Sequence, residues 1–86
     1  MTTLVRQIGR RVRALREARE WSQEQLAERS SLNRSYIGEV ERGNVIASVV
    51  TIDKIAHALD LSLAQLLDMK PAALAGTAPI PTPYPR

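Results

Sequence analysis

The sequence predicts an all-α domain of five short helices followed by an extended, proline-rich C-terminal tail. Apolar residues recur at spacings of three and four through most of the chain, which is typical of amphipathic helices. Ser-x-x-Gln pairs stand where two of these helices would begin, and no segment shows convincing strand alternation. All five prolines come after residue 70. The tail is therefore expected to be extended and polyproline-like rather than helical.

The first two helices are predicted from periodicity and capping. Residues 3–19 form an amphipathic helix, and its apolar face contains Leu4, Ile8, Val12 and Leu15. Ser22 and Gln25 form a capping box that begins a second helix, which ends near Ser30.

The last two helices are predicted in the same way. Ser48 caps a fourth helix, whose buried face is expected to contain Val49, Ile52, Ile55, Ala56 and Leu59. Ser62 and Gln65 form a second capping box. It opens a fifth helix that carries Leu63, Leu66 and Leu67.

Composition excludes several classes of protein. The 86 residues allow one small domain, and without cysteine there are neither disulfides nor thiolate metal sites, which fits a reducing, cytoplasmic setting. No apolar run approaches the roughly 18 residues that cross a bilayer, so no membrane contact is expected. Asp53, His57 and Asp60 share one face of the fourth helix, but such a lone histidine is usually solvated surface. The sequence therefore predicts no metal, no cofactor and no enzymatic activity.

Positive charge is concentrated in the first half of the chain. Residues 1–42 contain nine arginines and six glutamates, whereas the charges of residues 43–86 cancel. Arginine binds phosphate through a planar fork of donors. Two interpretations stay open for the arginines of the first helix: a surface that contacts phosphates, or a solvated helix face.

A helix-turn-helix is predicted between residues 23 and 42. Asn33 is a good N-cap for the third helix, which ends at Gly43. The inward positions of the motif are Leu26, Ala27, Leu32, Ile37 and Val40. A second helix anchored by one apolar face and polar on the other fits the major groove of DNA.

These residues resemble a known family. The segments Trp21–Arg29 and Asn33–Gly43 are similar to the lambda-repressor-like, Cro/cI-type (XRE) helix-turn-helix regulators. The third helix, from Asn33 to Ile37, is most similar to the controller proteins of restriction–modification systems. The resemblance implies a compact repressor-like DNA-binding domain over residues 3–69, with residues 70–86 as the tail.

The resemblance also implies the site residues. Base-reading positions fall on Asn33, Arg34, Ser35 and Glu39, and contacts to the DNA backbone fall on Gln23, Tyr36, Arg42 and Asn44. Arg16 and Glu41 occupy the positions of an ion pair that braces the first helix against the third. Arg34 can bridge guanine O6 and N7, and Glu39 can accept from cytosine N4. Phosphates repel a neighbouring carboxylate unless it accepts a hydrogen bond from such a base donor or pairs with an arginine.

Three residues depart from the family pattern. Ser31 and Glu20 stand where the family commonly has glycine, and a Cβ in a left-handed conformation costs roughly 1 kcal/mol. Gly38 lies inside the third helix and lowers its helix propensity by about 1 kcal/mol. These departures predict a domain with little stability to spare.

The resemblance implies a sequence-specific regulator of transcription, a small autoregulating repressor or controller protein that binds double-stranded DNA. A homodimer on a pseudo-palindromic operator is expected, because one small helix-turn-helix contacts too few base pairs for useful selectivity. The candidate dimer interface contains Val49, Val50, Leu63, Leu66 and Leu67. An alternative is an antitoxin-type module that neutralises a partner protein, for which the tail is a candidate contact.

Overall fold

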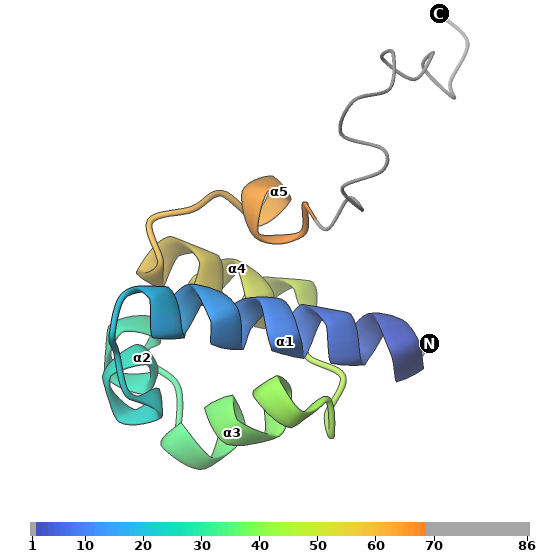
Figure 1. Cartoon of the computed structure of the whole chain (residues 1–86), viewed down its shortest axis with the longest axis horizontal. Coiled ribbons are helices and arrows are strands. Elements are labelled where there is room, and N and C mark those ends of the chain that lie inside the picture. Colours follow the sequence, from blue (N-terminus) through green and yellow to red (C-terminus); the bar gives the residue numbers. More distant parts are fainter. Residues whose placement is uncertain (1, 69–86) are drawn as a thin grey trace, which may run out of the picture.

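The computed structural model describes residues 2–68, which form five helices and no strand. The helices are α1 (Thr2–Ala18), α2 (Gln23–Ser30), α3 (Arg34–Arg42), α4 (Val49–Ala58) and α5 (Leu63–Leu66). Figure 1 shows α1 running across the molecule, with α3 on one side of it and α4 and α5 on the other. Helix α2 contacts both α3 and α4, and α3 packs on α1. The all-α prediction is confirmed for these residues, whereas the predicted tail and its protein contact lie outside them.

Side-chain caps begin the helices where the sequence predicts them. Ser22 Oγ accepts from Gln25 N at 3.1 Å, and Gln25 Oε1 accepts from Ser22 N at 2.8 Å. The same reciprocal pair joins Ser62 and Gln65, at 3.0 and 2.8 Å. Ser48 Oγ accepts from the backbone at the start of α4. Each bond satisfies a backbone group that the helix leaves unpaired at its first turn.

Three non-glycine residues adopt the left-handed conformation directly after helices. Glu20 has φ 58° and Ser31 has φ 59°, as their positions predict. Asp60, with φ 61°, was not predicted. The turn from α4 to α5 repeats the turn from α1 to α2: in each, an acidic left-handed residue is followed by one apolar residue and a capping serine.

All five helices contribute residues to the core. Its buried members are Val12, Leu26, Ala27, Ile37, Val40, Ile52, Ile55, Ala56, Leu59 and Leu66. All predicted inward positions of the helix-turn-helix are buried except Leu32, which is half-buried against this core. No buried side-chain polar atom in residues 2–68 lacks a hydrogen-bond partner, so the small interior contains no unpaired polar group that would destabilise it.

Two predictions about the apolar residues are wrong. Val49 was expected on the buried face of α4 but is 68% exposed, because the first turn of that helix lies at the edge of the core. Leu66 was expected in a dimer interface but is fully buried in the monomer, where α5 packs on α4. Arg11 donates to the carbonyls of Leu66 and Gln65, at 3.1 and 3.0 Å, and so ties α1 to the end of α5.

Gly9 allows α1 and α3 to approach closely. A Cβ at this position would lie 2.3 Å from the carbonyl oxygen of Val40 and 2.7 Å from that of Glu41. Both atoms belong to the backbone of α3, so they cannot move aside as a flexible side chain could. The distance between the two helices therefore depends on a residue without a side chain.

We predict that Gly9→Ala lowers the free energy of unfolding by about 1–3 kcal/mol, because overpacking pushes α3 away from α1. Gly38→Ala is the matched control, since its Cβ would meet only the guanidinium of Arg42. That substitution should leave stability unchanged or raise it by up to about 1 kcal/mol through helix propensity. Urea denaturation measures both. Equal effects of the two variants would contradict the close-approach interpretation.

Candidate nucleic-acid interface

Helix α3 presents one face to the core and the opposite face to solvent. Ile37 and Val40 are 0% and 3% exposed, and Ala27 in α2 is small enough for the two helices to cross closely. Ser35, Glu39 and Arg42 lie four and three residues apart, so they share the outer face of α3. A polar helix face is thus held outward by two buried aliphatic side chains.

The N-terminal end of α3 contains three exposed polar residues. Asn33 Oδ1 accepts from Ser35 N at 2.7 Å and caps the helix, which leaves the amide group of Asn33 free to donate elsewhere. Arg34 is exposed and has neither a hydrogen bond nor an ion pair within residues 2–68. Its guanidinium can therefore meet an acceptor outside the protein. Tyr36 is half-buried and packs against the core.

At the C-terminal end of α3, Glu39 contacts both Arg42 and Asn44. Glu39 forms an ion pair with Arg42, and Asn44 N donates to the carbonyl oxygen of Glu39 at 2.9 Å. Hydrogen bonds from Arg42, and then from Asn44, lower the pKa of the Glu39 carboxyl. Glu39 thus has an arginine partner on its own helix.

The predicted ion pair of Arg16 and Glu41 joins α1 to α3 inside the protein. Arg16 Nε and Nη2 donate to the two carboxylate oxygens of Glu41, at 2.7 and 3.0 Å. The side chains are 11% and 2% exposed, and hydrogen bonding to Glu41 raises the pKa of Arg16. Arg16 Nη1 also donates to the carbonyl oxygen of Trp21 at 2.7 Å. The guanidinium therefore holds α1, α3 and the turn before α2 together.

Gln23, the first residue of α2, belongs to the same network. Its Nε2 donates to Glu41 Oε1 at 3.1 Å, so the side chain predicted to bind phosphate is oriented by the buried carboxylate. Nothing in the sequence links these residues, because they are far apart along the chain. One hydrogen of the Gln23 amide remains for a group outside the protein.

Three other arginines in α1 or directly after it also bond within the protein. Arg11 donates to carbonyls of α5, and Arg19 Nη2 donates to the carbonyl oxygen of Leu59 at the end of α4. Arg13 pairs with Glu17 at 3.0 Å on the surface of α1. Arg11 and Arg19 thus join separate parts of the fold, whereas Arg13 remains on the exposed surface of α1.

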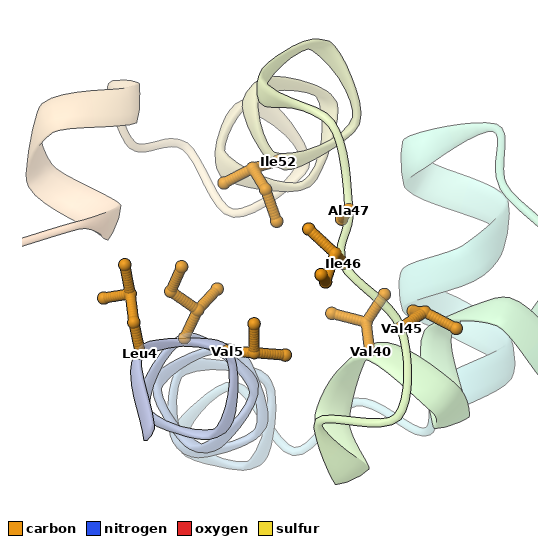
Figure 2. Close-up of a pocket in the computed structure, with 8 residues that line it drawn as sticks. Leu4, Val5, Val40, Val45, Ile46, Ala47 and Ile52 are labelled. Atoms are coloured by element: carbon orange, nitrogen blue, oxygen red, sulfur yellow. The ribbon is translucent and has the colours of Figure 1, made fainter. Parts of the chain in front are cut away.

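An apolar hollow of about 170 Å³ lies beside the start of α1. Figure 2 shows Leu4 and Val5 on α1 facing Val45, Ile46 and Ala47 of the loop that joins α3 to α4, with Ile52 of α4 closing one side. Next to the hollow, Ile46 is 78% exposed. Sequence reasoning missed Ile46 because it falls in a loop, outside every helical pattern.

Four large apolar side chains in or near this region are exposed: Leu4 and Ile46 line the hollow, and Val49 and Val50 stand in the first turn of α4, just after the loop. We call these four residues the apolar patch. Of the other predicted interface residues, Leu67 is 37% exposed, whereas Leu63 is half-buried against the core. Exposed aliphatic side chains next to a hollow are typical of a contact surface.

Neither a metal cluster nor a membrane span occurs in the described part of the chain. No three His, Cys, Asp or Glu side chains within residues 2–68 could together hold a metal ion. His57 Nε2 lies 3.5 Å from Asp53 Oδ1 on the surface of α4. None of the helices in residues 2–68 has the length and hydrophobicity needed to cross a membrane.

A family model described as helix-turn-helix matches residues 12–74, which include α2 through α5 and the C-terminal part of α1. The chain belongs to the XRE-type helix-turn-helix family. Members of this family are DNA-binding regulators rather than enzymes. The predicted resemblance to Cro/cI-type regulators is thereby confirmed.

Several XRE-type relatives are similar along most of the folded region. Control protein C.SmaI of Serratia marcescens is 43% identical over 60 residues, which cover 70% of this chain and 71% of that protein. The immunity repressor protein of Bacillus phage phi105 is 35% identical over 60 residues, which cover 70% of this chain and 42% of the repressor. The chain thus spans less than half the length of the phage repressor.

Among solved structures, the restriction-modification controller protein C.AhdI from Aeromonas hydrophila is 48% identical and superimposes with a TM-score of 0.71. The match covers 77% of this chain and 98% of C.AhdI. The helices that present α3 outward in this chain are therefore arranged as in a controller protein of the XRE-type family.

We predict that Arg16→Met lowers the free energy of unfolding by about 3–5 kcal/mol, because it leaves the Glu41 carboxylate buried without a partner. The double variant Arg16→Met/Glu41→Leu should recover most of this loss. Arg13→Met is the control, since its pair with Glu17 is exposed and contributes at most about 1 kcal/mol. Urea denaturation measures the free energy of unfolding of all three. If Arg16→Met lowers it no more than Arg13→Met does, the bracing role is wrong.

Proposed function

We propose that this chain is a sequence-specific, double-stranded DNA-binding regulator of transcription that binds a pseudo-palindromic operator as a homodimer. One observation carries the proposal: the outer face of α3 is polar and exposed, while Ile37 and Val40 anchor the inner face in the core. A helix held in this way can enter the major groove. The names of the relatives, an immunity repressor and control proteins, support the same function.

The start of α3 supplies the base-reading residues of the proposal. Arg34 can donate two hydrogen bonds to a guanine, and the amide of Asn33 and the hydroxyl of Ser35 can reach neighbouring bases. Glu39, one turn further along the helix, can accept from a cytosine. All four side chains stand on or beside the outer face of α3.

Backbone contacts flank these residues. Gln23 is the first residue of α2, where the helix dipole and free N–H groups favour a phosphate. Its orientation by Glu41 fixes the direction in which the amide can donate. Arg42 and Asn44, at the other end of α3, can contact a second phosphate, and Tyr36 in the first turn of α3 is the fourth backbone-contacting residue of the proposal.

The apolar patch supports a second copy of the chain as the partner. Its members Ile46, Val49 and Val50 are each more than two-thirds exposed, and such side chains are removed from water when subunits pair. Twofold pairing would place two α3 helices about 34 Å apart, one turn of B-form DNA. We therefore place the dimer interface at Val49 and Val50, with Leu67 and the partly exposed Leu63 at its edge.

Selection of bound duplexes from a random library tests the function directly. The expected result is a pair of inverted half-sites. If the selected duplexes bind no more tightly than their shuffled counterparts, the chain is not a sequence-specific regulator.

We predict that Arg34→Ala weakens operator binding by about 1–3 kcal/mol and relaxes the preference at one base pair of each half-site. The reason is the loss of a two-bond contact to one base. Repeating the duplex selection with the variant measures the preference, and an unchanged preference would remove Arg34 from base reading.

Gln23→Ala serves as the contrasting variant. Because a phosphate contact does not depend on base sequence, this variant should lower the affinity for all duplexes by the same factor. A loss confined to the operator would contradict the phosphate role. Circular dichroism controls for folding, since Gln23 also bonds the buried carboxylate.

We predict that Val50→Asp raises the dimer dissociation constant more than about tenfold, because a carboxylate would be buried in an apolar interface. Sedimentation equilibrium measures the constant, and operator affinity should fall in parallel. Ala14→Asp adds the same charge at an exposed position of α1 and is the control. An unchanged dimer in Val50→Asp would show that the subunits pair elsewhere.

A further inference from the structure

Residues at the end of α3 that are positioned to contact DNA are bonded to each other instead. The Arg42 guanidinium pairs with the Glu39 carboxylate. It also lies over Gly38, where an added Cβ would be 3.2 Å from Nη1 and 3.3 Å from Nη2. The arginine side chain therefore folds back along its own helix. Gly38 provides the space in which it does so.

A DNA phosphate and Glu39 would compete for the same donors. Of the two carboxylates in α3, Glu41 is buried with Arg16, so Glu39 is the negative charge on the outer face. If Arg42 turns to a phosphate, the Glu39 carboxylate loses its partner beside the negatively charged backbone of the duplex. If Arg42 stays with Glu39, the protein makes one phosphate contact fewer.

We propose that Glu39 is a specificity-determining residue that holds Arg42 in the free protein and releases it to a phosphate only where the duplex gives the carboxylate a hydrogen-bond donor in exchange. This inference rests on the proposed function. Cytosine N4 is a donor of the required kind in the major groove. A duplex without a donor at that position binds more weakly in either case. If Arg42 contacts the phosphate, Glu39 is left unpaired, and if Arg42 stays with Glu39, the phosphate contact is lost.

The exchange differs from a simple base contact. A residue that only adds a hydrogen bond at the operator strengthens binding there and leaves other duplexes unaffected. Glu39, in contrast, weakens binding to duplexes that do not match. Its removal should therefore increase affinity for non-cognate DNA, an outcome that the loss of an ordinary contact does not produce.

The test compares Glu39→Gln and Glu39→Ala with the unaltered protein on two duplexes, one selected from a random library and one shuffled. Both variants should bind the shuffled duplex more tightly. The slope of log affinity against log salt concentration should steepen by about 0.9, which corresponds to one additional phosphate contact. The ratio of affinities for the selected and shuffled duplexes should fall.

Glu17→Gln is the matched control. It removes the same charge and breaks an arginine–glutamate pair on the surface of α1, 3.0 Å long between Arg13 Nε and Glu17 Oε2. Its salt slope and affinity ratio should equal those of the unaltered protein. A similar change in the salt slope or affinity ratio of this control would show that the effect comes from net charge alone, and it would overturn the proposal.

Arg42→Gln tests whether the effect acts through the arginine. In that background, Glu39→Gln should no longer steepen the salt slope, since no arginine remains to be released. The same steepening in both backgrounds would show that Glu39 acts by repulsion alone, and it would overturn the proposal.

The outcomes separate this inference from the function on which it rests. If the unaltered protein prefers the selected duplex and the Glu39 variants keep that preference in full, the role of Glu39 is wrong and the regulator proposal stands. If the unaltered protein shows no preference for any duplex, both are wrong.

Discussion

The buried ion pair of Arg16 and Glu41 determines where α3 lies. Its two hydrogen bonds, 2.7 and 3.0 Å long, connect α1 to the end of α3 in a nearly solvent-free environment. A buried charge without its partner would be strongly unfavourable, so the pair opposes any displacement of α3 that would separate the two charges. The bonds to Trp21 and Gln23 extend this constraint to the start of α2. The two helices of the motif are therefore oriented by one carboxylate.

The arginine-rich first half of the chain serves two purposes. Arg11, Arg16 and Arg19 donate to groups on other helices and thus replace part of the apolar contact that so small a core lacks. Arg34 and Arg42 stand on the exposed side of α3 and support the proposed contact with DNA. Net charge alone does not separate these roles, because each depends on what the guanidinium reaches in the folded chain.

The same turn is used twice to change direction between helices. After α1 and after α4, an acidic residue in the left-handed conformation precedes one apolar residue and a capping serine. Glycine would adopt this conformation with less strain. The stability lost at Glu20, Ser31 and Asp60 is small for each residue, but a domain of this size has few contacts with which to offset it.

The five helices, their caps and the inward face of the helix-turn-helix could all be predicted from the amino-acid sequence. These features depend on residues three or four apart, so the local pattern contains the information. The packing of the helices, in contrast, buries Leu66, leaves Val49 and Ile46 exposed and brings Gln23 to Glu41. The folded structure also shows Arg42 lying over Gly38 toward Glu39. Each of these outcomes depends on which surfaces the packed helices leave uncovered or on the rotamer that a side chain adopts there, and spacing along the chain specifies neither.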